Sequence, residues 1–282
     1  MKLISFVTNG KATWGAVAVD GVVDLGRHLG ARYPDLKALL AADALDEARR
    51  TLASARPDAR LVDVELLPVI PNPDKILCIG HNYEEHRIET KREKTQHPTV
   101  FMRYADSQVA HGQPMLRPFE STQFDYEGEI AVVIGRGGRR IPEAEAWAHV
   151  AGYSCYNDGS VRDWQWHTSQ FGPGKNFYRT GAFGPWLVTA DEIAPGEEMT
   201  LSTRLNGETM QQTDTSRMIF PIPRLIAYCS TFIPLAPGDV FVTGTPGGVG
   251  AKRNPPVFMK DGDVVEIEVS RVGVLRNTVA PG

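Results

Sequence analysis

Short apolar runs, several with every second position polar, follow one another along most of the chain. Residues 199–205 alternate cleanly and lead into Asn206-Gly207, and residues 264–269 alternate after a turn at Asp261-Gly262. Alternation with a period of two predicts strands that are buried on one face, and Asn-Gly favours a tight hairpin. Helical patterns, such as residues 223–232, are fewer. We therefore expect many short strands and few helices.

The first 70 residues have the pattern of a small separate unit. The strands expected here cover residues 3–7, 14–19 and 22–25, and an extended stretch covers 62–69. Pro34 opens a helix that reaches residue 40, because proline is favoured in a first turn, and Asp43 can cap a second helix. Residues 70–74 are typical of a linker. The sequence therefore predicts a small N-terminal domain over residues 1–70, used for packing or dimerisation, and a larger domain over residues 71–282.

Two carboxylates stand directly before the most apolar strand of the larger domain. Residues 130–134 are apolar and mostly β-branched, and Glu127 and Glu129 precede them. Residues two apart in a strand point to the same face, so the two carboxylates should converge. Burying two like charges together is unfavourable unless a cation neutralises them. This predicts a divalent metal site, and Asp158, at the end of a strand over residues 151–158, is the candidate third ligand.

A histidine and a glutamate are three residues apart after the strand at residues 75–79. Asn82 is a plausible helix cap with Glu85 in the capping-box position, which places His86 and Glu89 on one helix face. A carboxylate beside an imidazole fixes its tautomer and suits a general base. The alternative is an ordinary solvated ion pair. Residues 83–94 are polar all round, so a mobile lid that closes over ligand is a further hypothesis.

Further polar side chains follow the expected strands. Arg162 and Gln165 are three apart on a short helix and can reach into one site together, and a glycine-rich loop ends at Lys175. Residues 243–250, Thr-Gly-Thr-Pro-Gly-Gly-Val-Gly, combine bare amides with hydroxyls and suit a small anion such as a carboxylate. This loop lacks the Gly-Lys-Ser/Thr ending of a phosphate loop. The alternative is a plain connection.

Composition and charge exclude several classes of protein. The chain has 282 residues, 42% hydrophobic residues and a net charge of −4, which is ordinary for a globular protein and gives no support for a nucleic-acid partner. No run approaches transmembrane length, and the N-terminus is too short and polar for a signal peptide. Cys78, Cys155 and Cys229 lie far apart in apolar surroundings. They indicate reduced thiols of a cytoplasmic protein without membrane contact.

These motifs, in this order, resemble the fumarylacetoacetate hydrolase family over roughly residues 70–280. The resemblance places the metal ligands at Glu127, Glu129 and Asp158. Its other functional residues fall on catalytic His86, Glu89 and Lys175 and on substrate-binding Arg162, Gln165, Thr245, Tyr83 and Arg103. The family implies an α+β, mainly β fold, with a mixed β-sandwich roll behind a small N-terminal α/β domain, and a homodimer. His81, Gly159 and the short segment before Lys175 depart from the family pattern.

Three carboxylates without a His or Cys ligand select a hard cation such as Mg²⁺ or Mn²⁺, with Ca²⁺ as an alternative. The expected substrate is a small anionic 2-oxo or diketo acid of the acylpyruvate type. We expect hydrolysis of a C–C bond, with water activated by His86 and the departing enolate stabilised by Lys175. The alternatives on the same site are an oxaloacetate-type decarboxylase and a 2-hydroxymuconate-type isomerase. A structural Ca²⁺ site without catalysis is a third interpretation.

Overall fold

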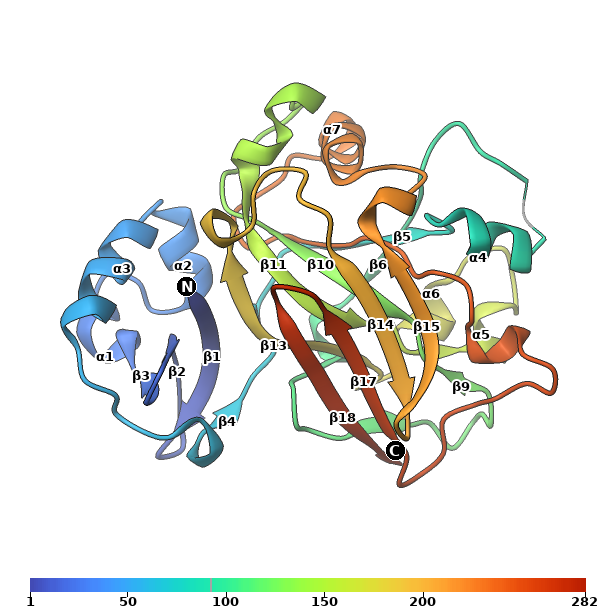
Figure 1. Ribbon diagram of the computed structural model, residues 1–282, viewed down its shortest axis with the longest axis horizontal. Helices are drawn as coiled ribbons and strands as arrows, with labels where there is room; N and C mark the ends of the chain where they lie inside the picture. Colours follow the sequence, from blue (N-terminus) through green and yellow to red (C-terminus); the bar gives the residue numbers. More distant parts are fainter. Residues whose placement is uncertain (92) are drawn as a thin grey trace.

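The computed structural model describes residues 1–91 and 93–282, and its fold rests on two β-sheets (Figure 1). The larger sheet has 11 strands. Its strands, in spatial order, are β3 (Gly21–Val23), β2 (Lys11–Ala18), β1 (Lys2–Thr8), β13 (Gly181–Thr189), β11 (Val150–Asn157), β10 (Gly128–Ile134), β16 (Val240–Val242), β5 (Ile76–Gly80) and β6 (Thr99–Arg103), with β4 (Glu65–Leu66) beside β1 and β7 (Gln108–Val109) beside β13.

A second sheet of five strands packs against the centre of the first. Its order is β15 (Glu208–Asp214), β14 (Thr200–Leu205), β17 (Val264–Val269), β18 (Gly273–Pro281) and β8 (Met115–Arg117). A short pair joins β12 (Ser160–Val161) to β9 (Phe124–Asp125). Most neighbours are antiparallel, whereas β16 with β5, β18 with β8 and β13 with β7 are parallel. The predicted hairpin at Asn206-Gly207 joins β14 to β15, with both residues at positive φ.

Seven α-helices and several 3₁₀ turns connect the described strands. The α-helices are α1 (Leu25–Leu29), α2 (Leu36–Ala41), α3 (Leu45–Ser54), α4 (Glu84–Glu89), α5 (Arg162–Gln165), α6 (Gly172–Lys175) and α7 (Ile222–Phe232). In Figure 1, α1, α2 and α3 lie beside the N-terminal strands, while α4, α5 and α6 gather at the opposite end of the larger sheet. That end carries the residues predicted to be functional.

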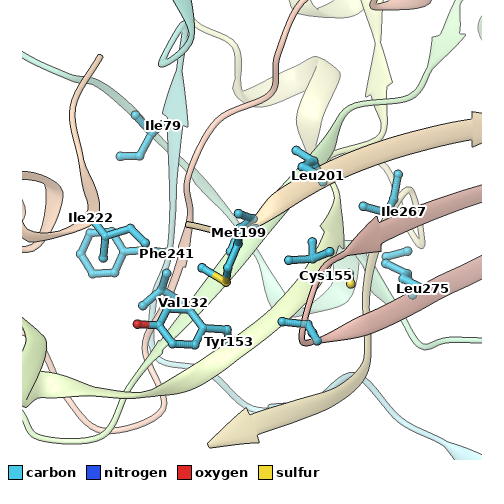
Figure 2. Close-up of a cluster of buried hydrophobic side chains, with 14 of the residues drawn as sticks. Ile79, Val132, Tyr153, Cys155, Met199, Leu201, Ile222, Phe241, Ile267 and Leu275 are labelled. Atoms are coloured by element: carbon cyan, nitrogen blue, oxygen red, sulfur yellow. The ribbon is translucent and has the colours of Figure 1, made fainter. Parts of the chain in front are cut away.

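Strand β10 is buried on both faces, which explains its unbroken apolar run. Ile130 and Val132 belong to the core between the two sheets, whereas Ala131 and Val133 belong to a second core with the N-terminal helices. Figure 2 shows Val132 near Tyr153, Cys155 and Met199, with residues of the second sheet beyond them. Full burial of one such aliphatic side chain contributes about 1.5–3 kcal/mol. The core therefore fixes the strand that carries Glu129.

The N-terminal strands continue the larger sheet. Strand β1 pairs with β13, with Lys2 opposite Val188 and Leu3 opposite Leu187. The apolar faces of α2 and α3 share one core with β10 and β11. A domain division after residue 70 therefore stays a prediction, and one hydrogen-bonded sheet extends across the proposed boundary.

Several expected local structures differ in detail. Asp43 does not cap a helix, because α3 begins after Ala44 and Asp43 has φ of 51°. Asp35 caps α2 instead, accepting from the Ala38 amide at 2.7 Å. The third strand ends at Val23, and Asp24 caps a helix that the alternation did not predict. A 3₁₀ helix, Glu143–His149, precedes β11.

The segment expected to form a lid begins with α4 and includes residue 92, which lies outside the described residues. Residues 107–118 hold the two short strands β7 and β8. Within the described part of the chain, no helix is both long and apolar enough to cross a membrane.

Candidate active site and metal centre

The antiparallel pairing of β10 with β11 brings the three predicted metal ligands together. Gly128 lies opposite Asn157, and the Asp158 amide donates to the Glu127 carbonyl at 2.8 Å. One oxygen from each of Glu127, Glu129 and Asp158 lies within 4.8 Å of the others, and all three residues are buried. A Cβ on Gly128 would lie 2.0 Å from Thr203 Oγ1 of β14. The glycine between the two glutamates therefore allows the second sheet to approach.

Buried cations hold two of the three carboxylates. Lys175 Nζ lies 2.7 Å from Glu127 Oε2 and 2.6 Å from Asp158 Oδ2. Arg162 Nη1 lies 2.6 Å from Glu127 Oε1, and Arg103 Nη1 lies 2.6 Å from Asp158 Oδ1. Burial opposes ionisation of Glu127, yet Lys175 and Arg162 outweigh it and hold its pKa below the ordinary value. The predicted lysine therefore lies beside the predicted ligands.

Glu129 is the carboxylate whose charge is not compensated. It accepts a hydrogen bond from the Gly244 amide, and among the described residues it forms no ion pair. Burial, followed by the charges of Asp158 and Glu127, raises the pKa of Glu129 well above its ordinary value. A hard dication bound by three carboxylates would supply the missing positive charge. The donor set and its charge therefore fit a divalent metal ion.

His86 and Glu89 face each other on α4 as the spacing predicted. His86 Nδ1 lies 3.3 Å from Glu89 Oε2, and the His86 ring stacks on His81 with centroids 5.4 Å apart. Asn82 does not cap this helix. Its side chain donates to the Phe220 and Thr243 carbonyls and accepts from the Phe220 amide. Asn82 thereby connects the start of α4 to the strand end at residue 243.

The glycine-rich loop at residues 243–250 binds carboxylates, but the carboxylates are the protein's own. The amide of Gly244 donates to Glu129, that of Gly248 to Glu89 at 3.1 Å, and that of Gly250 to Asp125 at 2.8 Å. Gly244 has φ of 104° and a Cβ there would lie 2.6 Å from Asn82 Cβ, so this position requires glycine. The expectation that these amides cradle a substrate carboxylate is corrected accordingly.

Arg162 combines an anchored guanidinium with one unused donor. Its Nε donates to Asp125 Oδ2 at 2.8 Å, and its Nη1 donates to Gln165 Oε1 at 2.8 Å. Its Nη2 is buried without a hydrogen-bond partner among the described residues. A buried donor of this kind costs free energy until a ligand pairs with it. Arg162 is therefore suited to bind an anion.

A cavity of about 80 Å³ joins these groups. Its lining includes His86, Glu127, Glu129, Arg162, Gln165, Lys175 and Thr245. Thr245 Oγ1 already donates to the Gly128 carbonyl at 3.0 Å, so its hydroxyl also holds the start of β10, the strand that carries Glu129. A second cavity of about 680 Å³ shares His81, Trp166 and Phe171 with the first and leads outward.

Two residues expected to contact substrate do not line this cavity. Arg103 is fully buried behind Asp158, where it also donates to the Gly159 carbonyl and to Thr180 Oγ1 at 3.0 Å. Tyr83 is 1% exposed and its hydroxyl has no hydrogen-bond partner in the described part of the chain. Arg103 thus holds Asp158 in this structure, and substrate contact by Arg103 or Tyr83 stays a prediction.

A family model for the fumarylacetoacetate (FAA) hydrolase C-terminal domain matches residues 75–280. The chain belongs to the fumarylacetoacetate hydrolase family. It is 42% identical to the mitochondrial oxaloacetate tautomerase of Xenopus laevis over 238 residues, which cover 84% of this chain and 75% of that protein. It is also 42% identical to oxaloacetate tautomerase YisK of Bacillus subtilis over 223 residues, 78% of this chain and 74% of that protein.

A solved structure of another enzyme has a similar fold. Maleylpyruvate hydrolase from Sphingobium sp. SYK-6, in complex with manganese(II) ion and pyruvate, superposes with a TM-score of 0.83 at 27% identity, and the whole of both chains is covered. The predicted family and its mainly β fold with mixed sheets are confirmed. The chain is therefore an enzyme, and it resembles the members that act on small 2-oxo acids.

Sequence reasoning missed two residues that order this family member's site. Asp125 holds Arg162 and the Gly250 amide, and its position two residues before Glu127 was a signal that it shares a face with the ligands. Gln211 of β15 accepts from the Gly128 amide at 3.0 Å and donates to Thr245 Oγ1 at 2.8 Å and to the Pro246 carbonyl at 3.0 Å. The sequence around Gln211 carries no signal of this role.

Gln211→Met should destabilise the protein by about 1–3 kcal/mol, because the Gly128 amide and the Pro246 carbonyl would stay buried without a partner. Urea unfolding measures this change. Gln212→Met is the matched control, because the Gln212 side chain, next to Gln211 on β15, is exposed. This substitution should change the free energy of unfolding by less than about 0.5 kcal/mol. Equal stability of the two variants would contradict the role given to Gln211.

Proposed function

We propose that this protein catalyses keto–enol tautomerisation of a small 2-oxo acid of the oxaloacetate class, assisted by a divalent cation at Glu127, Glu129 and Asp158. The observation that carries the proposal is Arg162 Nη2, a buried donor without a hydrogen-bond partner among the described residues. Arg162 lines the same cavity as His86, Glu127 and Glu129. The 42% identity to two oxaloacetate tautomerases supports this reaction. Mg²⁺ and Mn²⁺ are the proposed ions, with Ca²⁺ as the alternative.

The metal ion, when bound, supplies Lewis-acid polarisation of the substrate carbonyl. Arg162 Nη2 and Gln165 would bind the adjacent carboxylate, which fixes the substrate for proton transfer. His86, with Nδ1 held by Glu89, would use Nε2 to remove a proton from the carbon next to the carbonyl. The same imidazolium would deliver a proton to the carbonyl oxygen. Lys175 would stabilise the negative charge that develops on that oxygen.

Hydrolysis of an acylpyruvate, which the sequence placed first, is the second candidate. The cavity of about 680 Å³ that leads outward from the site has room for an acyl chain beyond the 2-oxo acid. The maleylpyruvate hydrolase with the same fold supports this candidate too. Here His86 would take its proton from water, which then attacks the distal carbonyl. Decarboxylation of oxaloacetate would need the same polarised carbonyl and no water.

Product identification separates these reactions. Enol oxaloacetate is mixed with the Mn²⁺-loaded protein, the loss of enol absorbance is followed, and products are assigned by NMR. The keto acid as sole product supports tautomerisation, whereas pyruvate with CO₂ indicates decarboxylation. An acylpyruvate in a parallel reaction should stay intact, and its cleavage into two acids would favour the second candidate. The homodimer and the cytoplasmic location stay predictions, and light scattering tests the first.

A further inference from the structure

Lys252 is the one cation lining the described active-site cavity that has no carboxylate partner. Arg162 and Lys175 are tied to the protein's own carboxylates. Lys252 forms no ion pair with any residue that the structure describes. Its Nζ lies 5.4 Å from the ring centroid of Trp166, a half-exposed residue that lines both the active-site cavity and the outer cavity. The ammonium group is thereby held at the mouth of the site by a weak contact.

Asp125 fixes the backbone next to Lys252 relative to the Arg162 side chain. Its Oδ2 accepts from Arg162 Nε at 2.8 Å and from the Ala251 amide at 2.9 Å, and its Oδ1 accepts from the Gly250 amide. The residue before Lys252 and the guanidinium of Arg162 therefore share one buried anchor. The distance between the two free donors, Arg162 Nη2 and Lys252 Nζ, can vary only through the lysine side chain. Arg162 and Lys252 line one cavity of about 80 Å³, so a ligand that reaches both must be short.

We infer that Lys252 recognises a second carboxylate of the substrate, so that this site prefers short 2-oxo dicarboxylates to 2-oxo monocarboxylates. The inference rests on the proposed function and specifies its substrate class. One carboxylate pairs with Arg162 Nη2 inside the cavity, and the other pairs with Lys252 at its mouth. Trp166, which already contacts Lys252, covers the carbon chain between them. Charge-assisted pairing of this kind discriminates strongly against a ligand that lacks the second carboxylate.

Binding of two unreactive acids tests the inference without requiring turnover. Malate and lactate are both 2-hydroxy acids and differ by the distal carboxylate. Their dissociation constants are measured calorimetrically on the Mn²⁺-loaded wild-type protein and on Lys252→Met. Malate binding should weaken by about tenfold to hundredfold in the variant, and lactate binding should be unchanged. Lys252→Arg should retain most of the preference for malate.

Lys260→Met is the matched control, because Lys260 is an exposed lysine outside the cavity lining. It should bind both acids as the wild type does. Equal affinity of the wild type for malate and lactate would overturn the inference. So would an equal loss of affinity for the two acids in Lys252→Met. A wild type that leaves oxaloacetate unchanged, yet binds malate through Lys252, would refute the proposed reaction and support this dicarboxylate specificity.

Discussion

Glu129→Gln should abolish divalent-cation binding and turnover while leaving the metal-free protein at least as stable as the wild type. Glu129 is buried beside Glu127 and Asp158 and has no ion-pair partner among the described residues, so its charge opposes folding when no cation is bound. A glutamine keeps an oxygen that can accept from the Gly244 amide. Removal of the charge relieves this repulsion and also deletes a metal ligand.

Glu127→Gln is the informative comparison, because it should have the opposite effect on stability. Glu127 pairs with Lys175 and Arg162, and its loss leaves two buried cations with fewer partners. We expect destabilisation by about 3–5 kcal/mol. Urea unfolding in chelator, repeated with Mn²⁺, measures both effects. Mn²⁺ at about 100 times its dissociation constant should stabilise the wild type by about 2.7 kcal/mol and neither variant. Equal destabilisation by both substitutions would contradict the assignment of charges.

His86→Gln should lower the turnover rate by about 10²–10⁴-fold without weakening metal binding, because it removes the proton carrier and leaves the carboxylate ligands in place. His86 is buried, lines the cavity and has its Nδ1 beside Glu89. Glu89→Gln should give a smaller loss, since the imidazole stays but loses its oriented charge partner. Steady-state kinetics with Mn²⁺ titration measures both.

His97→Gln is the control for this series. His97 is an exposed histidine that stacks on Tyr228, and it does not line the active-site cavity. Its replacement should leave the rate within about twofold of the wild type. A His86→Gln rate equally close to the wild type would remove His86 from the mechanism, whatever its geometry.

The cluster of Glu127, Glu129 and Asp158 was predictable because its signal is local. A strand has a side-chain period of two, so Glu127 and Glu129 had to share a face, and β-branched residues over 130–134 identified the strand. The same reasoning predicted the contact between His86 and Glu89, which depends only on helix geometry. Local geometry also supported the Asn206-Gly207 hairpin.

Residues whose partners lie far along the chain could not be placed in this way. Gln211 contacts the Gly128 amide 83 residues away, and no short pattern records such a contact. Asn82 looked like a helix cap, but its partners at Phe220 and Thr243 are 138 and 161 residues away. The pairing of β1 with β13, which extends the sheet across the proposed domain boundary, is of the same kind.

For the glycine-rich loop the chemistry was predicted and the ligand was not. Exposed amides do bind carboxylates there, but composition cannot tell a substrate from side chains that arrive from α4, β9 and β10. Arg103 shows the same limit. The family resemblance suggested substrate contact, whereas in the structure Arg103 is buried behind Asp158 and pairs with that carboxylate.

That loop also constrains how such a site can change its substrate. One run of eight residues, 243–250, donates to Glu129, a proposed metal ligand, to Glu89, the partner of the proposed base, and to Asp125, the anchor of Arg162. A substitution that shifts the backbone of this run would disturb all three contacts, so we expect few replacements to be tolerated there. The side chains of Lys252 and Trp166 line the same cavity from outside this run. New substrates are therefore most accessible to this scaffold, in nature or in directed evolution, through its rim.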